Sequence, residues 1–453
     1  MTPGIARDAY LQDFRELENV LPGRKVPWVN QLRNQALGQF MAVGLPTTRQ
    51  EEWKYTDVRP IEKRAFHPLV TDSKKVITQG IKPYLFENLT AHQLTFVDGH
   101  YVPELSSLHS LAAGVVISSL AQVLNENPEL VEGYLGRRVD IESHGFAALN
   151  AAFLKDGAVI YLKSNATIEE PIHLLFLSSG RQEGVAYLRN LIIADDNCQA
   201  TVIESYVGLG ETPYLTNTIT EIFAGKNASV EHYKLARESE WGYHVAGIHV
   251  DQARDSRYFS HNIAMGGRIV RNDMRTLLDG QGSECLLNGL YVAHGRQHID
   301  NHTRIDHRKS HGTSREWYKG VLGGHARGIF NGRVVVHQDA QKTDAQQTNN
   351  NLLLSDDAEA DSQPQLEIYA DDVKCSHGST VGQLDPDALF YLRSRAIDES
   401  LAKSLLVYAF ANDILDRITL APIRVQLEQF IAKRLLNTEG ASIGKTMPGG
   451  KLI

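Results

Sequence analysis

The 453-residue sequence lacks most features of secreted, membrane or nucleic-acid-binding proteins. Its three cysteines are widely spaced and odd in number, so they form no disulfide framework. The first ten residues lack the apolar segment of a signal peptide, and the longest apolar runs fall far short of the ~20 residues that span a bilayer. The formal net charge is −8, and no basic run interleaved with aromatics occurs. We therefore expect a cytoplasmic protein with no membrane and no nucleic-acid partner.

The common catalytic motifs are also missing. There is no G-x-S-x-G elbow, no H-E-x-x-H helix and no C-x-x-C pair. No motif therefore supports an ordinary hydrolase, metalloprotease or thioredoxin function. Gly444-Lys445-Thr446 resembles the end of a phosphate-binding loop, but Glu439 stands where that motif requires glycine. The following Met-Pro-Gly-Gly cannot open the helix that would hold a phosphate. We expect this chain to bind no nucleotide.

The N-terminal region, residues 1–157, is expected to be helical or mixed. Residues 31–43 carry apolar side chains at helical spacing and stop at Gly44. Residues 95–102 are typical of a hairpin, because Asp98-Gly99 suits the positive φ of a tight turn.

From residue 158 to residue 384 the sequence is almost continuously strand-like, in short pieces separated by Gly, Asn and Asp. The absence of a convincing long helix over this length excludes a doubly wound α/β sheet. Asn-Gly turns are too scarce for a large sandwich. Uniform short strands favour a solenoid, in which each coil buries its apolar face on the next, although no crisp hexapeptide period is present.

The C-terminal region, residues 385–436, is expected to be helical. Asp385 can cap a helix that has Pro386 at its first position, where no N–H donor is needed. Apolar periodicity predicts helices at 388–397, 399–418 and 423–436. The Gly-rich tail, 437–453, is expected to be flexible.

The most informative segment is 366–382, where Cys375 lies two positions before His377 in a strand-like run. Positions i and i+2 of a strand share a face, roughly 7 Å apart. A sulfur beside an imidazole nitrogen suits iron, zinc or copper better than magnesium or calcium. Two ligands do not complete a site, so a second chain is a natural source of others. Spacing alone leaves open that both are packing residues.

A histidine-rich stretch gives a weaker metal signal. Its spacings of four and five residues put the rings on changing faces of a strand, so we favour a polar strand-and-turn surface over a metal site. The members are His294, His298, His302, His307 and His311, with Asp300, Asn301 and Asp306 among them. Cys198 and Cys285 lie in apolar or mixed strand segments and are expected to be buried and inert.

Taken together, several segments make the chain resemble the SufB/SufD family of iron–sulfur cluster assembly proteins, and its SufD branch in particular. The resemblance extends from residue 158 to residue 416, with Gly44-Leu-Pro and Glu52-Trp-Lys-Tyr-Thr56 added near the N-terminus. The segments of the core are Leu287-Asn-Gly-Leu-Tyr291, Ile299-Asp-Asn-His-Thr303, Tyr318-Lys-Gly320, Gly328-Ile-Phe-Asn-Gly332, Ala340-Gln-Lys-Thr-Asp-Ala-Gln346, Asn350-Asn-Leu-Leu-Leu354, 364–378 and Phe390-Tyr-Leu-Arg-Ser-Arg395.

The resemblance implies a mainly β fold, with a right-handed parallel β-helix core flanked by N- and C-terminal helical parts. It implies pairing with SufB through the cores and binding of the SufC ATPase through the C-terminal helices. The family's candidate cluster-assembly residue at the SufB–SufD interface corresponds to His377. SufB carries a cysteine after Phe-Tyr where this chain has Leu392, which puts cluster building by this subunit alone in doubt.

We therefore interpret the chain as a non-enzymatic scaffold subunit that contributes to cluster assembly and iron acquisition. A transient iron–sulfur cluster would be shared with SufB, with His377 as the main ligand or transfer residue and Cys375 as a weaker one. An open strand edge through Tyr369 and Val373 predicts that the isolated chain forms a homodimer with its two His377 side chains near the axis.

Two alternatives remain at this point. A β-helix carbohydrate-active enzyme would use carboxylates such as Glu367, Asp371 and Asp372, and would need a groove lined by aromatic and acidic side chains. A purely structural adaptor would use Cys375 and His377 for packing only.

Overall fold

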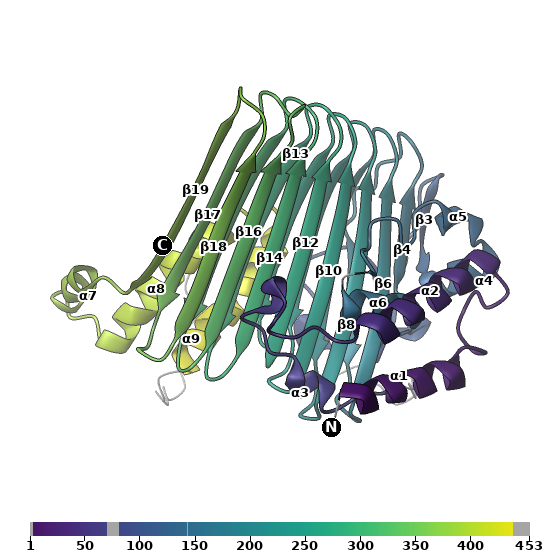
Figure 1. Ribbon diagram of the computed structural model, residues 1–453. Helices are drawn as coiled ribbons and strands as arrows, with labels where there is room; N and C mark the ends of the chain where they lie inside the picture. Colours follow the sequence, from purple (N-terminus) through teal and green to yellow (C-terminus); the bar gives the residue numbers. More distant parts are fainter. Residues whose placement is uncertain (1–2, 70–80, 143, 438–453) are drawn as a thin grey trace. The chain divides into compact units, whose positions relative to one another are not determined.

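Two long parallel β-sheets, stacked coil upon coil, form the main part of the molecule in the computed structural model, which describes residues 3–69, 81–142 and 144–437 (Figure 1). One sheet has the strand order β19-β17-β15-β13-β11-β9-β7-β5-β1-β2 and the other β18-β16-β14-β12-β10-β8-β6-β4-β3. From β4 onward, successive strands therefore alternate between the two sheets. This confirms the predicted mainly β fold with a parallel β-helix core.

The strands are β1 (His92–Val97), β2 (His100–Tyr101), β3 (Val115–Ser119), β4 (Ala158–Leu162), β5 (Ile172–Ser178), β6 (Gly184–Ala194), β7 (Gln199–Gly208), β8 (Tyr214–Ala224), β9 (Ser229–Arg237), β10 (Gly242–Gln252), β11 (Arg257–Met265), β12 (Ile269–Leu278), β13 (Glu284–Ala293), β14 (His298–His307), β15 (Thr313–Leu322), β16 (Arg327–Val336), β17 (Asp344–Leu353), β18 (Glu359–Ile368) and β19 (Lys374–Gln383). The α-helices are α1 (Pro3–Leu17), α2 (Pro27–Val43), α3 (Arg59–Glu62), α4 (Leu120–Glu126), α5 (Glu129–Glu132), α6 (Gly145–Ala152), α7 (Pro386–Arg393), α8 (Glu399–Leu415) and α9 (Ala421–Asn437), with short 3-10 turns at η1 (Glu51–Trp53), η4 (Lys82–Tyr84) and η5 (Pro103–Leu105).

Each coil adds about 30 residues, but the spacing is not constant. Paired positions lie 26 residues apart between Ile248 and Met274, and 32 apart between Gly332 and Pro364. A period that varies this much explains why no short repeat is visible in the sequence. The strands are also longer than the apolar runs suggested. For example, the run 190–193 covers only the second half of β6, and the polar Arg189 just before it is buried as well.

One corner of the coils is fixed by a residue with positive φ. In each case its backbone N–H donates to a carbonyl of the next coil, as from Asn165 to Asp196 (2.8 Å). The first side chains also form a ladder, since Asn197 donates to Asn165 (3.0 Å) and Asn227 to Asn197 (3.1 Å). Short polar residues and glycine tolerate this backbone conformation best. The series is Asn165, Asn197, Asn227, Asp255, Gly282, His311 and Lys342.

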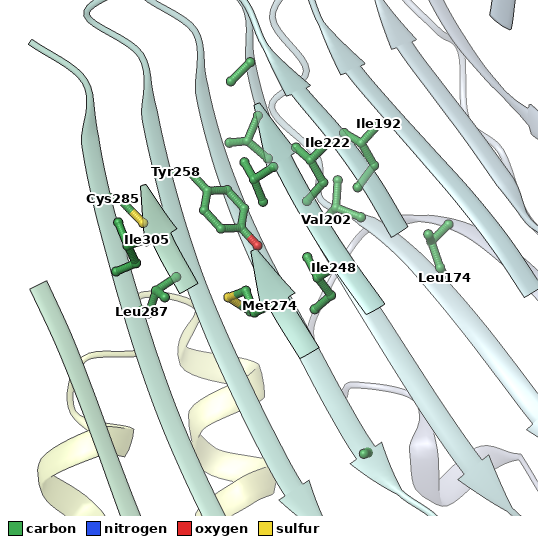
Figure 2. Packing of buried hydrophobic residues seen from close by; sticks show 14 of the residues in the cluster. Leu174, Ile192, Val202, Ile222, Ile248, Tyr258, Met274, Cys285, Leu287 and Ile305 are labelled. Atoms are coloured by element: carbon green, nitrogen blue, oxygen red, sulfur yellow. The ribbon is translucent and has the colours of Figure 1, made fainter. Parts of the chain in front are cut away.

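The core lies between the two sheets, where side chains from successive coils stack in rows (Figure 2). Ile192, Ile222 and Val250 occupy one such row, and Tyr258 pairs with Cys285 in the facing sheet. Cys198 and Cys285 are both buried, as predicted, and burial raises the pKa of each thiol. Stacked aliphatic rows of this kind supply the main stabilisation of a solenoid.

The N-terminal region contributes to both sheets as well as helices. β1 pairs in parallel with β5, β3 pairs antiparallel with β4, and β1 and β2 form the predicted hairpin with positive φ at Asp98 and Gly99. α2 spans the helix predicted at 31–43 and ends before Gly44, which has φ 71°. α6 lies against β6 and β8, and α2 packs on α6 (Figure 1).

Residues 1–85 and 90–381 form one compact unit, and residues 382–453 with 86–89 form a second. The described part of the second unit contains α7, α8 and α9, close to the three predicted helices. The Asp385 side chain accepts from the Asp387 N–H and Pro386 opens α7, as predicted. Apart from Asn437, the predicted tail lies outside the described residues, as do Glu439 and Lys445. None of the described helices is both long and apolar enough to cross a bilayer.

Candidate site on the last coil

The last strand of one sheet, β19, carries both predicted site residues. The Lys374 N–H donates to the Thr343 carbonyl (2.8 Å), and the Thr380 hydroxyl donates to the Asn350 side chain (2.8 Å). This parallel register puts Cys375 beside Ala345 and His377 beside Gln347 of β17. β19 is the end strand of its sheet, so its other edge has no strand partner among the described residues.

Cys375 and His377 differ in their surroundings although they share a strand face. Cys375 is half-buried and packs with Leu366 and Val373 on the end of the core. Burial raises the pKa of its thiol, so a metal would have to displace the thiol proton. His377 is exposed. Among the described residues, no third His, Cys, Asp or Glu joins the two in a group whose ligand atoms lie within 4.8 Å of one another.

A polar column leads from His377 into the interior. Gln347 pairs with Glu316 of β15 in the register, and its side-chain amide donates to the Glu316 carboxyl (2.6 Å). Both side chains are fully buried, and burial raises the pKa of Glu316 to about 7. Neither residue was predicted from the sequence as part of a site. The sequence does show a carboxylate, Glu316, at one of the alternating positions of a strand. Alternation alone does not say which face of the strand points into the core.

The two sheets are joined by hydroxyl groups in the same coil. The Ser379 hydroxyl of β19 donates to Ser362 of β18 (2.7 Å), and Ser362 donates to the Asn349 side chain (2.7 Å). Asn349 also accepts from Asn351 (2.7 Å). The interior of the last coil is therefore lined in part by hydrogen-bonded polar groups.

Apolar side chains are exposed beside this polar interior. Ile368, Tyr369 and Val381 are 42%, 63% and 49% exposed, and all three lie at or next to β18 and β19. A strand edge without a partner, flanked by exposed apolar groups, is a surface suited to another protein chain.

The histidine-rich stretch forms no common site. His298 lies 2.8 Å from the Thr56 hydroxyl, His302 lies 3.1 Å from Asp300, and His307 lies 2.9 Å from the Ser314 hydroxyl. His311 is one of the corner residues with positive φ. His302 fits the expected polar strand-and-turn setting, but His307, Asp300 and Asn301 are buried, so the stretch as a whole is not a surface.

The N-terminal Trp53 to Thr56 segment is fastened to the outer face of the second sheet. Trp53 stacks on Phe146 (5.6 Å), and the Arg271 guanidinium lies 3.8 Å from the Trp53 ring centre. The Thr56 hydroxyl donates to Asp300, which also pairs with Arg271 (2.5 Å). Arg271 holds the pKa of Asp300 below its usual range although burial opposes this. In the sequence, this segment stood out only through its family resemblance.

Two of the three carboxylates named for the carbohydrate-enzyme alternative form ion pairs with basic side chains. Glu367 forms an ion pair with Arg333, and Asp372 forms one with Lys342. The hollow of about 100 Å³ next to Arg333 is lined mainly by charged and amide side chains, together with Met274, His302 and Thr303, and by no Phe, Tyr or Trp. A larger hollow of about 490 Å³ does combine aromatic and acidic side chains, including Tyr134, Phe223 and Asp195, but none of the three named carboxylates lines it.

The fold is a parallel β-solenoid whose end strand, β19, carries Cys375 and His377. The chain matches a family model described as the SUF system FeS cluster assembly SufBD core domain over residues 176–410, and one described as the SufBD protein N-terminal region over residues 5–174. It therefore belongs to the SufBD family of iron–sulfur cluster assembly proteins.

Three relatives agree with this. An iron–sulfur cluster assembly SufBD family protein of Synechocystis is 32% identical over 95% of this chain and 96% of its own length. Iron–sulfur cluster assembly protein SufD of Escherichia coli is 33% identical, over 92% of both chains. SufD of Bacillus subtilis is 27% identical over 94% of this chain and 97% of its own length. The relatives thus include proteins named SufD that align over nearly their whole length.

Proposed function

We propose that this chain is a non-enzymatic scaffold subunit that assembles iron–sulfur clusters at an interface between its last coil and a SufB paralogue. The observation that carries the proposal is the partial ligand set, Cys375 and His377, on a strand edge without a partner. Iron in a cluster needs more ligands than two, and thiolate and imidazole are both suitable donors. A transient cluster shared with SufB would draw its remaining ligands from that partner.

The apolar groups around the edge supply the affinity for SufB. Tyr369 and Val381 would lose exposed surface on contact, and the edge of β19 could continue into a strand of the partner. The same edge would pair two copies of this chain when SufB is absent, so the homodimer and the heterodimer compete for it.

This chain is proposed to bind no nucleotide, so the ATPase activity would belong to the partner SufC. The C-terminal helices would bind that partner. Leu401 and Leu405 are 46% and 41% exposed one turn apart on α8, and Val425 of α9 is 46% exposed. Exposed apolar groups on amphipathic helices are typical of helix-in-groove docking. All three thiols of the chain are free, which suits the reducing cytoplasm.

Co-expression with SufB and SufC under anaerobic conditions tests this function. The complex would be isolated through a tag on this chain and analysed for bound subunits, iron and acid-labile sulfide. We expect both partners and a cluster to co-purify with the parent chain, and SufB to be lost with Val381→Asp. Val20→Asp, at an exposed apolar residue distant in sequence, is the matched control and should leave capture unchanged. Full SufB capture by Val381→Asp would overturn the interface, and a complex without iron or sulfide would overturn the scaffold role.

A further inference from the structure

A second group of possible metal ligands lies at the opposite end of the first sheet from β19. His92 is the first residue of β1, His109 follows η5, and Glu170 lies two positions before β5. Their ligand atoms all lie within 4.8 Å of one another, and this is the only such group of three among the described residues. None of the three belongs to the candidate site on the last coil.

Backbone hydrogen bonds hold the three segments together. The His92 N–H donates to the Pro171 carbonyl (3.0 Å), next to Glu170. Gln93 and Ser107 exchange two backbone hydrogen bonds (2.7 and 2.8 Å), which fixes the segment that leads to His109. The donors therefore sit on a frame that exists before any ion binds, which limits the ordering cost of binding.

One of the two distances from Glu170 is close to that of a metal centre, and the other is too short. The Glu170 Oε2 atom lies 2.5 Å from His109 Nδ1 and 3.7 Å from His92 Nε2. Metal–ligand bonds of about 2.0–2.2 Å in tetrahedral geometry place donor atoms roughly 3.3–3.6 Å apart. The second distance fits, and the first must lengthen by about 1 Å. The His109 and Glu170 side chains are 43% and 39% exposed, so both have room to move.

His92 is the fixed member of the group. Its side chain is only 4% exposed, so the ring has little room to move. Its Nδ1 accepts from the His109 N–H at 3.2 Å. Coordination through Nε2 puts the ring proton on Nδ1, so this one hydrogen bond must open when a metal binds.

From this geometry we propose that His92, His109 and Glu170 form a binding site for a divalent transition-metal ion of the zinc class, separate from the cluster-assembly site. Two imidazoles and a carboxylate suit Zn²⁺, Co²⁺ or Fe²⁺ rather than Mg²⁺ or Ca²⁺. The exposed side of the group leaves the fourth position to water, as in three-ligand zinc sites.

Titration of the full chain with Zn²⁺ and Co²⁺ tests the site. The parent for this experiment is the Cys375→Ser/His377→Ala double variant, so that the last coil contributes no metal ligand. We expect one Zn²⁺ per chain by calorimetry, visible d–d bands with Co²⁺ that Zn²⁺ abolishes, and no competition from Mg²⁺. His109→Ala and Glu170→Gln should each weaken Zn²⁺ binding at least tenfold. Both change exposed or half-exposed side chains, so the fold is expected to remain intact.

His325→Ala is the matched control, because His325 also lies beside a carboxylate, Asp357 (3.6 Å), but has no third ligand. It should leave the affinity unchanged. A parent that binds no Zn²⁺, or one whose affinity survives both His109→Ala and Glu170→Gln, would show that the group is only a hydrogen-bonded His109–Glu170 pair.

Discussion

The hydroxyl groups of Ser379 and Ser362 lie 2.7 Å apart and connect the last strand of one sheet to the last strand of the other. Because Cys375, His377 and Ser379 alternate along one strand, this contact establishes which way their common face points: toward the interior of the last coil. His377 thus stands at the end of the column formed by Gln347 and Glu316 and is itself exposed. A residue in that position can receive a ligand from outside and contact buried polar groups within.

His377→Ala should leave the fold and the complex intact and strongly lower the iron and sulfide content of the complex. An exposed imidazole contributes little to stability, so the free energy of unfolding should change by less than about 0.5 kcal/mol. Cys375→Ser should lower cluster content less, if the half-buried thiol is accessory. The measurement is iron and sulfide per complex, with His325→Ala as the exposed-histidine control. An unchanged cluster content in His377→Ala would contradict the assignment.

Glu316→Gln should flatten the pH dependence of stability. Burial raises the folded-state pKa of Glu316 from 4.5 to about 7, so the folded state binds more protons than the unfolded state between these values. The stability associated with the protonated carboxyl is full below pH 4.5 and is lost as pH rises through 7, on the order of 3 kcal/mol. Glutamine keeps the shape and does not ionise.

Urea unfolding at pH 5 and pH 8 measures this effect. The parent should lose more stability than Glu316→Gln between the two values, while Glu359→Gln, at an exposed carboxylate, should behave as the parent. Equal losses in the parent and in Glu316→Gln would mean that Glu316 titrates normally in the folded chain.

Trp53→Ala should destabilise the protein by about 3–5 kcal/mol, because a large buried ring is lost and a cavity remains. The stack on Phe146 and the Arg271 contact both disappear. Trp241 is 41% exposed, so Trp241→Ala should cost less than about 1 kcal/mol. Chemical unfolding of both variants measures the change in the free energy of unfolding. Similar losses of stability in the two variants would show that the Trp53 segment does not pack on the sheet in solution.

Leu401→Asp/Leu405→Asp should abolish binding of the SufC ATPase and leave SufB capture unchanged. Both side chains are exposed, so the fold should tolerate the charges, whereas an apolar groove would not. Truncation after Leu384 should have the same effect, and Lys403→Ala on the same helix is the control. Pull-down of SufC at full affinity by the truncated chain would place the docking site elsewhere.

Tyr369→Asp should convert the isolated protein from a dimer to a monomer in light scattering at micromolar concentration. The reason is a new charge on a 63% exposed aromatic side chain beside the end strands. Val20→Asp should remain dimeric. A parent chain that is already monomeric would overturn the predicted homodimer.

The sequence alone determined the features that depend on local chemistry. Asp385 and Pro386 start α7, Asp98 and Gly99 turn the first hairpin, and the i, i+2 spacing puts Cys375 and His377 on one face. Each depends on backbone preferences of a few adjacent residues, which are the same in any fold. The motifs of the core likewise identified the family without any knowledge of packing.

Only the tertiary structure decided which distant residues meet. His377 lies above Gln347 and Glu316 because coils of unequal length fix the register, and no constant period in the sequence encodes that offset. Thr56 reaches His298 across 242 residues, and His109 reaches Glu170 across 61. Contacts at such separations form when the sheets stack and bury their faces together, so they depend on the whole solenoid rather than on any local pattern.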